Sequence, residues 1–418
     1  MKNMRKKIGT ITIIIIWFSI FSGAIYSQEK TVDELYFQGV DKIENHQQFK
    51  EALPYFQQII KLDPKNADAH YQMGKIYRNI GQIDQAMAYY ENAIALRPDY
   101  SSAYYELGLL YIELGKKSEA MNSFKQAIKS NPDFSRAHYG LGLVYNELER
   151  YDDSIIAFEQ ALIIEPSDPQ AYYGLGITYE KIGKYQESIN VLEKAVSYQP
   201  DYGKAFYHLG MNYKELNMLQ EAVENLEKAA NYLKDSSDAI YYSIGMIYKN
   251  MEKKEIDAIN YFKKATIANP QYIDAYFYIG WLNNSLGQYD KTIAAYQEVI
   301  KLDPNYTYIY YNLGWAYGEL ERYEEAAENF KLAVAQNQGD ADAYYGLGWA
   351  NSQMEKYDEA KESLIKAIQL QPDYIYAHYS LGMIYLIEKD RNAALDEYKI
   401  LKDLDENTAN RLFDMIYQ

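Results

Sequence analysis

Tryptophan recurs in this chain at a spacing that suits the binding of flat ligands. Trp281, Trp315 and Trp349 follow one another at intervals of 34 residues, and the chain holds four tryptophans in all. An indole ring buries a large apolar area and offers a flat face on which other rings can stack. The row therefore predicts either a surface that stacks against a bound ligand or side chains that pack between neighbouring elements. The sequence leaves both interpretations open.

Other residue types that carry out chemistry are absent or scattered. The chain has no cysteine, which excludes disulfides and thiolate metal sites. Its five histidines are far apart in the sequence, and neither a glycine-rich phosphate loop nor a nucleophile motif occurs. The net charge of −17 argues against nucleic acid, which needs a concentrated basic face. We therefore expect no catalytic residues, no metal site, no cofactor and no enzymatic activity.

The spacing of the tryptophans belongs to a period that runs through almost the whole chain. A glycine recurs at intervals of 34 or 35 residues, at Gly39, Gly74, Gly108, Gly142, Gly176, Gly210, Gly245, Gly280, Gly314, Gly348 and Gly382. A fixed period of this size marks an array of supersecondary units, each too small to bury its own apolar face. The sequence thus predicts about eleven repeats.

Each repeat has the pattern of two helices. In the tenth repeat, Tyr344, Leu347 and Gly348 have the i, i+3, i+4 spacing of one helix face. A second amphipathic segment follows around Leu364, and Pro372 ends it because proline cannot continue a helix. Small residues at the glycine position let the two helices approach closely. We therefore expect an all-α array of antiparallel helix pairs.

This pattern resembles the tetratricopeptide repeat family, whose repeats carry an aromatic residue, Leu-Gly, Tyr, Ala, Phe, Ala and Pro. The third repeat matches it at Tyr104, Leu107, Gly108, Tyr111, Ala120, Phe124, Ala127 and Pro132. In the numbering within one repeat, the glycine is position 8 and the proline is position 32. The resemblance implies a right-handed superhelical solenoid in which one face of the first helices lines a concave groove.

Positions 5 and 9 of the first helix would lie on that groove face. The candidate ligand-binding residues are Trp281, Trp315 and Trp349 with Met246 and Met383 at position 9, Phe277, Tyr311, Tyr345 and Tyr379 at position 5, and Tyr308 and Tyr376 at position 2. Glycine at position 6, in Gly140, Gly174 and Gly346, is expected to open the groove locally. Packed helices lie ~8–10 Å apart and an extended peptide advances ~3.3 Å per residue, so about every third ligand residue would meet one ring.

The ends of the chain differ from the array. Residues 1–27 combine a basic start, an apolar run and small residues, which is typical of a secretory signal peptide. The alternative is an uncleaved membrane anchor formed by residues 8–25. The array is expected to span residues 28–408, with a soft boundary near 234–257 where two neighbouring repeats gain a residue. Residues 409–418 are expected to form a C-terminal capping helix.

These features predict an exported scaffold, in the periplasm or at the extracytoplasmic face of the membrane of a bacterial envelope. It would bind an extended segment of a partner protein in its aromatic groove, without catalysing a reaction. The alternative is a polysaccharide-binding module that acts in glycan export or cell-wall assembly, with its Tyr and Trp rings stacked on the glycan. A membrane would be contacted only through residues 8–25, if that segment is not cleaved.

Overall fold

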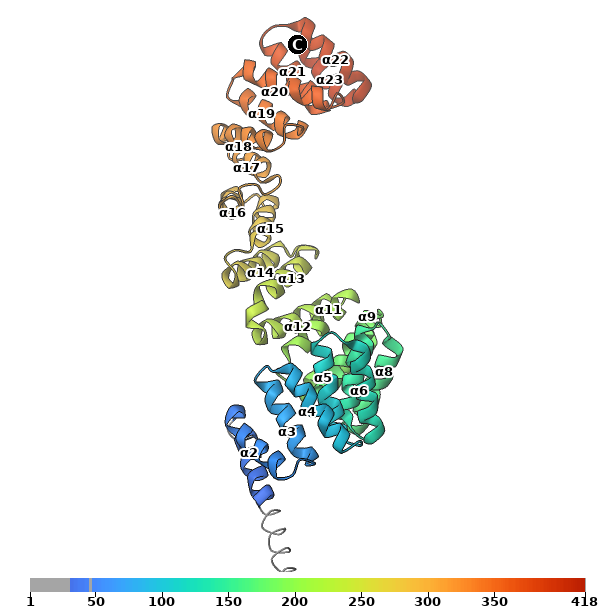
Figure 1. Cartoon of the computed structure of the whole chain (residues 1–418). Coiled ribbons are helices and arrows are strands. Elements are labelled where there is room, and N and C mark those ends of the chain that lie inside the picture. The colour runs from blue at the N-terminus through green and yellow to red at the C-terminus, as the bar shows by residue number, and fades with distance from the viewer. Residues whose placement is uncertain (1–30, 45–46, 418) are drawn as a thin grey trace, which may run out of the picture. The chain divides into compact units, whose positions relative to one another are not determined.

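The computed structural model describes residues 31–44 and 47–417, and this part of the chain is helical throughout (Figure 1). Short turns join the helices, and no strand occurs among the described residues. The predicted all-α array of helix pairs is therefore confirmed. The expected signal peptide or membrane anchor, residues 1–27, lies outside the described residues.

The chain divides into two compact halves between Met218 and Leu219. In the N-terminal half, residues 31–44 are helical and precede α2 (Phe49–Leu62), α3 (Ala67–Asn79), α4 (Ile83–Leu96), α5 (Ser101–Glu113), α6 (Lys117–Ser130), α7 (Ser135–Glu147), α8 (Tyr151–Ile164), α9 (Pro169–Lys181), α10 (Tyr185–Tyr198) and α11 (Gly203–Glu215). The C-terminal half contains α12 (Leu219–Tyr232), the 3-10 turn η1 (Lys234–Ser236), α13 (Ser237–Lys249), α14 (Glu255–Ala268), α15 (Ile273–Ser285), α16 (Tyr289–Leu302), α17 (Ile309–Gly318), α18 (Tyr323–Gln336), α19 (Ala341–Gln353), α20 (Tyr357–Leu370), α21 (Ile375–Ile387), α22 (Arg391–Leu404) and α23 (Glu406–Ile416).

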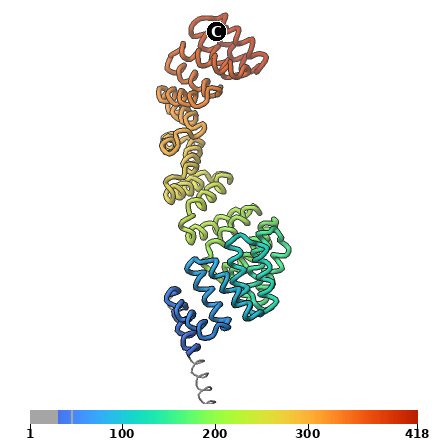
Figure 2. The backbone as a smooth tube through the Cα atoms, viewed as in Figure 1, coloured from blue at the N-terminus to red at the C-terminus, as the bar shows by residue number. Residues whose placement is uncertain are grey.

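A left-handed residue connects the two helices of each repeat, so that the backbone tube reverses direction within a few residues (Figure 2). In the second repeat this residue is Gly81, with a φ of 79°. The next N–H group, on Gln82, then donates to the carbonyl of Tyr77 at 2.8 Å, which satisfies an acceptor at the helix end. Other repeats have Glu149, Asn217 or Glu355 here, each also with positive φ. Where glycine is absent at Glu149 and Glu355, the two helices that the turn joins still contact each other, α7 with α8 and α19 with α20.

In most repeats an aromatic ring at position 24 lies at the centre of the helix pair, whereas Leu192 and Leu364 take this place in the fifth and tenth repeats. A Cβ added at Gly108, position 8 of the third repeat, would lie 2.7 Å from the ring of Phe124. A Cβ added at Gly140, position 6 of the fourth repeat, would also lie 2.7 Å from that ring. The fully buried ring thus lies between two glycines of consecutive repeats. The prediction that position 6 opens the groove is wrong for Gly140, Gly174 and Gly346, because the small size of each glycine admits the ring of the preceding repeat.

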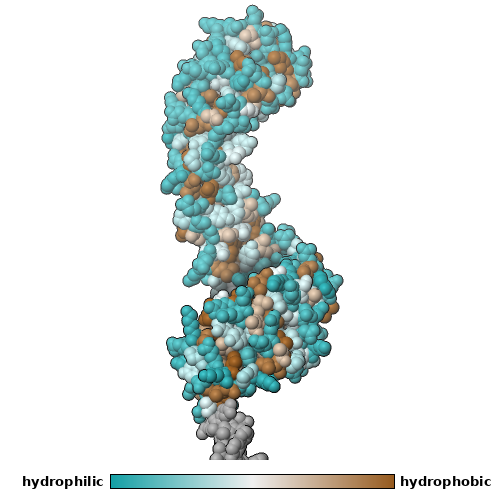
Figure 3. Space-filling model, viewed as in Figure 1, coloured by the Kyte–Doolittle hydropathy of each residue, from teal (hydrophilic) through white to brown (hydrophobic). Residues whose placement is uncertain are grey.

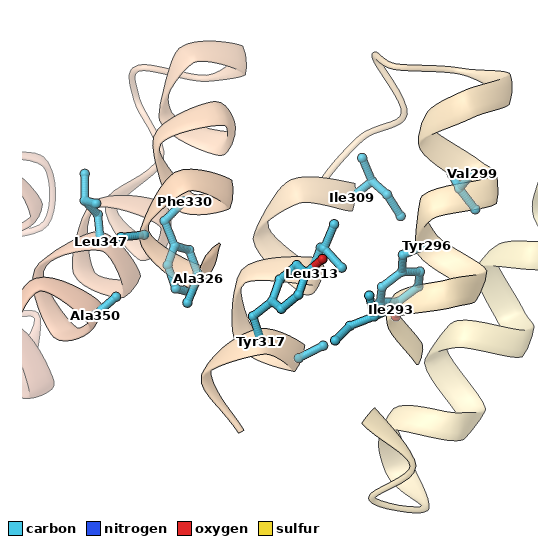
Figure 4. Packing of buried hydrophobic residues seen from close by; sticks show 12 residues of the cluster. Ile293, Tyr296, Val299, Ile309, Leu313, Tyr317, Ala326, Phe330, Leu347 and Ala350 are labelled. Atoms are coloured by element: carbon cyan, nitrogen blue, oxygen red, sulfur yellow. The ribbon is translucent and has the colours of Figure 1, made fainter. Parts of the chain in front are cut away.

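The same packing continues in the C-terminal half. Figure 4 shows Ile309, Leu313 and Tyr317 of α17 pointing toward the buried ring of Tyr296 on α16. On the other side of α17, Phe330 fills the space beside Gly314. α17 therefore buries residues against α16 of the preceding repeat and against its own partner α18, as stacked repeats require.

Two of the expected segment boundaries differ in detail from the observed ones. The halves divide at Met218–Leu219, whereas the sequence predicted a soft boundary near 234–257. There the added residues are absorbed by η1 and by a turn with a left-handed Lys253, and α13 contacts both α12 and α14. The capping helix α23 begins at Glu406, earlier than the expected 409–418, and its Leu412 packs against Gly382.

Candidate ligand-binding face

The sequence-predicted ligand-binding residues lie on first helices of the C-terminal half, and they differ in accessibility. Three side chains are exposed: Trp281 on α15 by 46%, Tyr308 at the start of α17 by 57%, and Tyr376 on α21 by 65%. The remaining candidates are half-buried: Met246, Phe277, Tyr311, Trp315, Tyr345, Trp349, Tyr379 and Met383. We call this set the first-helix face.

The tryptophan row is divided between packing and exposure. The rings of Trp315 and Trp349 lie 5.0 Å apart between centroids, and Trp315 also meets Phe330 edge-on at 5.3 Å. A Cβ added at Gly318 would lie 2.6 Å from the indole of Trp349, so this ring rests on the backbone of α17. These two tryptophans therefore join consecutive first helices, which agrees with the packing interpretation.

Trp281 has a different neighbour. The ammonium of Lys249, one repeat earlier on α13, lies 5.6 Å from the centre of the Trp281 ring. This cation–π contact, which Lys249 shares with Tyr278 at 5.4 Å, leaves almost half of the indole accessible. Lys249 and Gly318 both occupy the twelfth position of a first helix. A lysine there leaves the next tryptophan accessible, and a glycine there lets it pack.

A second aromatic pattern connects the two ends of single repeats. In six repeats a ring at position 34 lies over the ring at position 5, with centroids 5.0–5.4 Å apart: Tyr100 over Tyr71, Phe134 over Tyr105, Tyr202 over Tyr173, Tyr272 over Tyr242, Tyr306 over Phe277, and Tyr374 over Tyr345. This ring closes the space between the start of the first helix and the junction to the next repeat.

An aspartate at position 2 fixes the closing tyrosine in three of these repeats. The hydroxyl of Tyr100 donates to Asp68 at 2.6 Å, that of Tyr306 donates to Asp274 at 3.0 Å, and that of Tyr374 donates to Asp342. Burial and the neighbouring carboxylate raise the pKa of Tyr306, so the hydroxyl keeps its proton and remains a donor. We call this ring and its hydrogen bond the Tyr–Asp closure.

The ninth repeat exchanges the two residues of this closure. Tyr308 stands at position 2 and Asp340 at position 34. The Asp340 carboxylate accepts a hydrogen bond from the N–H of Ala343 and thereby caps α19. Tyr308 adopts a left-handed φ of 60°, and α17 begins at Ile309, two residues later than the repeat predicts. A bulky residue in this region costs roughly 1–3 kcal/mol.

A pocket of about 260 Å³ lies where the closing ring is missing. Its lining includes Asn305, Thr307, Tyr308, Tyr311, Asn337 and Asp340. Burial raises the pKa of the Tyr311 hydroxyl, and the adjacent tryptophan opposes the shift. Within the described part of the chain, the hydroxyl groups of Thr307 and Tyr308 make no hydrogen bond, whereas Asn337 accepts one from Gly339. The pocket thus combines an aromatic floor with open hydroxyl groups at its edge.

Neither the hydropathy of the surface nor the distribution of acidic side chains marks a further site among the described residues. The visible surface of each half is mainly hydrophilic, with apolar residues in separate patches (Figure 3). Across residues 31–44 and 47–417, no three His, Asp or Glu side chains gather in an arrangement that could hold a metal ion. In the same residues, none of the helices combines the length and apolar character needed to cross a membrane.

Family models place this chain among known repeat proteins. Models of the tetratricopeptide repeat match residues 239–272, 284–321, 307–340 and 341–374, and a model of the cilia and flagella-associated protein 70 C-terminal domain matches residues 40–241. The chain belongs to the tetratricopeptide repeat family, as its repeat pattern predicted. Members of this family are typically scaffolds without catalytic activity.

Solved structures of related fold cover parts of the chain, and no curated protein matches it. A crystal structure of MamA is 29% identical, with 39% of this chain and 96% of MamA covered at a TM-score of 0.36. YrrB, described as a TPR protein with an unusual peptide-binding site, is 22% identical over 42% of this chain and 91% of its own, at 0.38. PilF of Pseudomonas aeruginosa is 16% identical over 49% and 93%, at 0.46. With TM-scores below 0.5, these similarities support no inference about a site.

The repeat pattern indicated Tyr308 and Tyr311 as candidates but did not connect them with Asp340, Asn305 or Thr307. The signal was present in the sequence, because Tyr and Asp exchange positions 2 and 34 in the ninth repeat alone among the repeats that carry this pair. The consequence of this exchange became clear only from the structure, in which the ring at position 34 covers the ring at position 5 in other repeats.

Proposed function

We propose that this chain is a non-catalytic scaffold of the cell envelope that binds an extended segment of a partner protein along its first-helix face. The observation that carries the proposal is the exposure of Trp281 and Tyr376 on the first helices of the eighth and eleventh repeats and of Tyr308 just before the first helix of the ninth. Large aromatic side chains dominate the binding energy of protein interfaces, and their exposure in a folded chain marks a candidate interaction surface.

The repeat spacing favours an extended segment over a compact ligand. The aromatic positions recur once per repeat, and α19 contacts both α17 and α21. Because neighbouring helices pack ~8–10 Å apart, a ligand that reaches several of these rings has to run across successive helices. An extended polypeptide does so at about three residues per repeat.

The titratable groups support a scaffold without catalysis. In the described part of the chain, the side chains with shifted pKa values are mainly tyrosines made less acidic by burial and members of ion pairs, such as Arg78 beside Glu106 and Glu113. Burial of a tyrosine and pairing of an arginine are consequences of packing between repeats. Placement in the envelope rests on the signal-like residues 1–27.

Photo-crosslinking tests this proposal directly. The full chain carries p-benzoylphenylalanine either at Tyr376, 65% exposed on the first-helix face, or at Ile267, 80% exposed on the second helix α14. In envelope extracts we expect a defined polypeptide adduct from position 376 and none from position 267. Adducts from position 267 alone would contradict the proposal, and glycan adducts from position 376 would favour the polysaccharide alternative.

A matched pair of alanine variants measures the contribution of the exposed tryptophan. We expect W281A to weaken binding of the crosslinked partner about tenfold, because removal of a central aromatic anchor costs more than ~1 kcal/mol. I267A removes a more exposed apolar side chain from the second helix of the preceding repeat and is expected to leave binding unchanged. Equal effects of the two substitutions would contradict a role for the first-helix face.

A further inference from the structure

We propose that the pocket over Tyr311 binds an aromatic side chain of the partner segment, in the place where six other repeats hold a ring of their own. The inference rests on the proposed function and adds the specificity of one subsite. Its lining residues lie between Asn305 and Asp340, entirely within the C-terminal half.

The repeats themselves show which chemical group this space accepts. Six rings at position 34, five of them tyrosine and one phenylalanine, lie 5.0–5.4 Å from the ring at position 5. These distances fall in the range preferred by interacting aromatic pairs. In the ninth repeat the position-5 ring, Tyr311, is present but its partner is Asp340. The space beside Tyr311 therefore corresponds to the space that a ring fills in six other repeats.

Asp340 cannot replace the ring that its position normally supplies. Its carboxylate accepts from the N–H of Ala343 at 3.1 Å, at the first turn of α19, and this fixes its direction toward the helix backbone. The side chain of Asn337 is likewise committed, because it accepts from the N–H of Gly339 at 3.0 Å. The side chains of Asp340 and Asn337 therefore lie at the edge of the pocket and do not fill it.

The opposite edge is formed by the displaced start of α17. Tyr308 stands outside the helix with a left-handed backbone and an exposed ring, so it flanks the entrance. Thr307 and Tyr308 offer hydroxyl groups that are not engaged within the described chain. In other repeats the closing tyrosine donates to an aspartate at position 2, whereas an incoming tyrosine here would meet these hydroxyls. Both phenylalanine and tyrosine side chains thus fit.

The size of the pocket favours one side chain over a longer ligand. Its volume of about 260 Å³ is below the ~300–1,000 Å³ range of pockets for drug-sized molecules. A glycan chain would need stacking surface on either side of this pocket, and the neighbouring Trp315 and Trp349 are occupied with each other. We therefore favour a single aromatic residue carried by an extended backbone.

N-acetyl-tyrosine amide is the probe that tests the pocket, with saturation-transfer NMR on the full chain. We expect signal from its ring protons with the wild-type chain and at least tenfold weaker binding to D340Y, which restores the missing ring. D168Y is the matched control, because Asp168 also occupies position 34 and caps its helix, through the N–H of Gln170. We expect D168Y to bind the probe as the wild type does.

A double variant separates loss of the pocket from loss of folding. Y308D/D340Y recreates the Tyr–Asp closure of the eighth and tenth repeats, and we expect it to melt no lower than the wild type while binding no probe. Unchanged binding of N-acetyl-tyrosine amide to D340Y would overturn the proposal. Equal binding of N-acetyl-alanine amide, or binding of methyl glucoside in place of the aromatic amide, would also overturn it.

The outcome is distinguishable from failure of the proposed function. Polypeptide crosslinking from position 376 without binding of the aromatic amide would overturn the pocket alone. Amide binding that D340Y abolishes, without any polypeptide crosslink from position 376, would overturn the proposed scaffold function and still support a ring-specific pocket.

Discussion

The eighth and ninth repeats use the same two residue types with opposite results. In the eighth repeat Asp274 begins the first helix and Tyr306 ends the repeat, and their hydrogen bond of 3.0 Å closes the space between them. In the ninth repeat Tyr308 and Asp340 have exchanged places, and the space over Tyr311 is open. An aspartate at the junction caps the next helix, and a tyrosine at the start has no carboxylate to meet. Position within the repeat, and not composition, therefore determines whether a repeat is closed.

The core below this difference is common to both repeats, and its loss should have the largest effect. Phe330 and Tyr296 occupy position 24, and both are buried beside a position-8 glycine. We expect F330A and Y296A each to lower the free energy of unfolding of the C-terminal half by about 3–5 kcal/mol. Denaturant unfolding combined with hydrogen exchange measures the loss of stability in each variant. A much smaller loss in F330A would mean that the open repeat is also loosely packed.

The tryptophans provide the next largest contrast. Trp315 contacts Phe330 and Trp349, so W315A should lower the free energy of unfolding by about 2 kcal/mol, less than a fully buried ring would. W281A removes an exposed ring and should cost less than ~0.5 kcal/mol. Thermal and denaturant unfolding of the two variants distinguishes them. Similar losses would contradict the division of the row into packing and accessible residues.

Transfer of the ninth-repeat arrangement into the eighth repeat should open the space over Phe277. D274Y/Y306D removes the ring over Phe277 and its hydrogen bond, so we expect a loss of about 1–2 kcal/mol in stability. The same variant should gain a second site for N-acetyl-tyrosine amide. Saturation-transfer NMR in the D340Y background, where the original pocket is filled, isolates that site. If this variant does not bind the amide, exchange of Tyr and Asp is not sufficient to create the pocket.

The reverse exchange in the ninth repeat should have a smaller and favourable effect. Y308D/D340Y relieves a left-handed tyrosine, which costs roughly 1–3 kcal/mol, and adds a hydrogen bond, but it loses the cap on α19, worth about 1 kcal/mol. We expect a net gain of about 1 kcal/mol in the free energy of unfolding. A net loss, measured by urea unfolding, would mean that Tyr308 is not strained by the junction.

Low pH should have the smallest of these effects, a loss of stability in a closed repeat that the open ninth repeat does not share. Burial opposes the shift, but hydrogen bonds from Arg97 and Tyr100 lower the pKa of Asp68 below its usual 3.8. The stability from this closure is present above pH ~4 and is lost as the pH falls through the lowered pKa. Hydrogen exchange should therefore show the second repeat loosening in acid, and D68N should remove that dependence. An equal response in the ninth repeat would contradict this assignment.

Much of the fold was predictable from the sequence because it depends on contacts within one repeat. The period of 34 or 35 residues, the helix faces and the position-8 glycines together predicted helix pairs. The role of Gly140 was not predictable in this way. It lies against Phe124 of the preceding repeat, and a contact between repeats cannot be inferred from the pattern within one.

The candidate site shows the same division. Helical spacing places positions 2, 5 and 9 together, so the rings that recur on the first-helix face could be predicted from the repeat pattern. Their accessibility could not be predicted in this way, because the exposure of Trp281 or Trp349 depends on the contact with Lys249 or Gly318 one repeat earlier. Stacking brings residues together that are about 30 positions apart, and side-chain size at that contact determines whether a ring packs or stays open to a ligand.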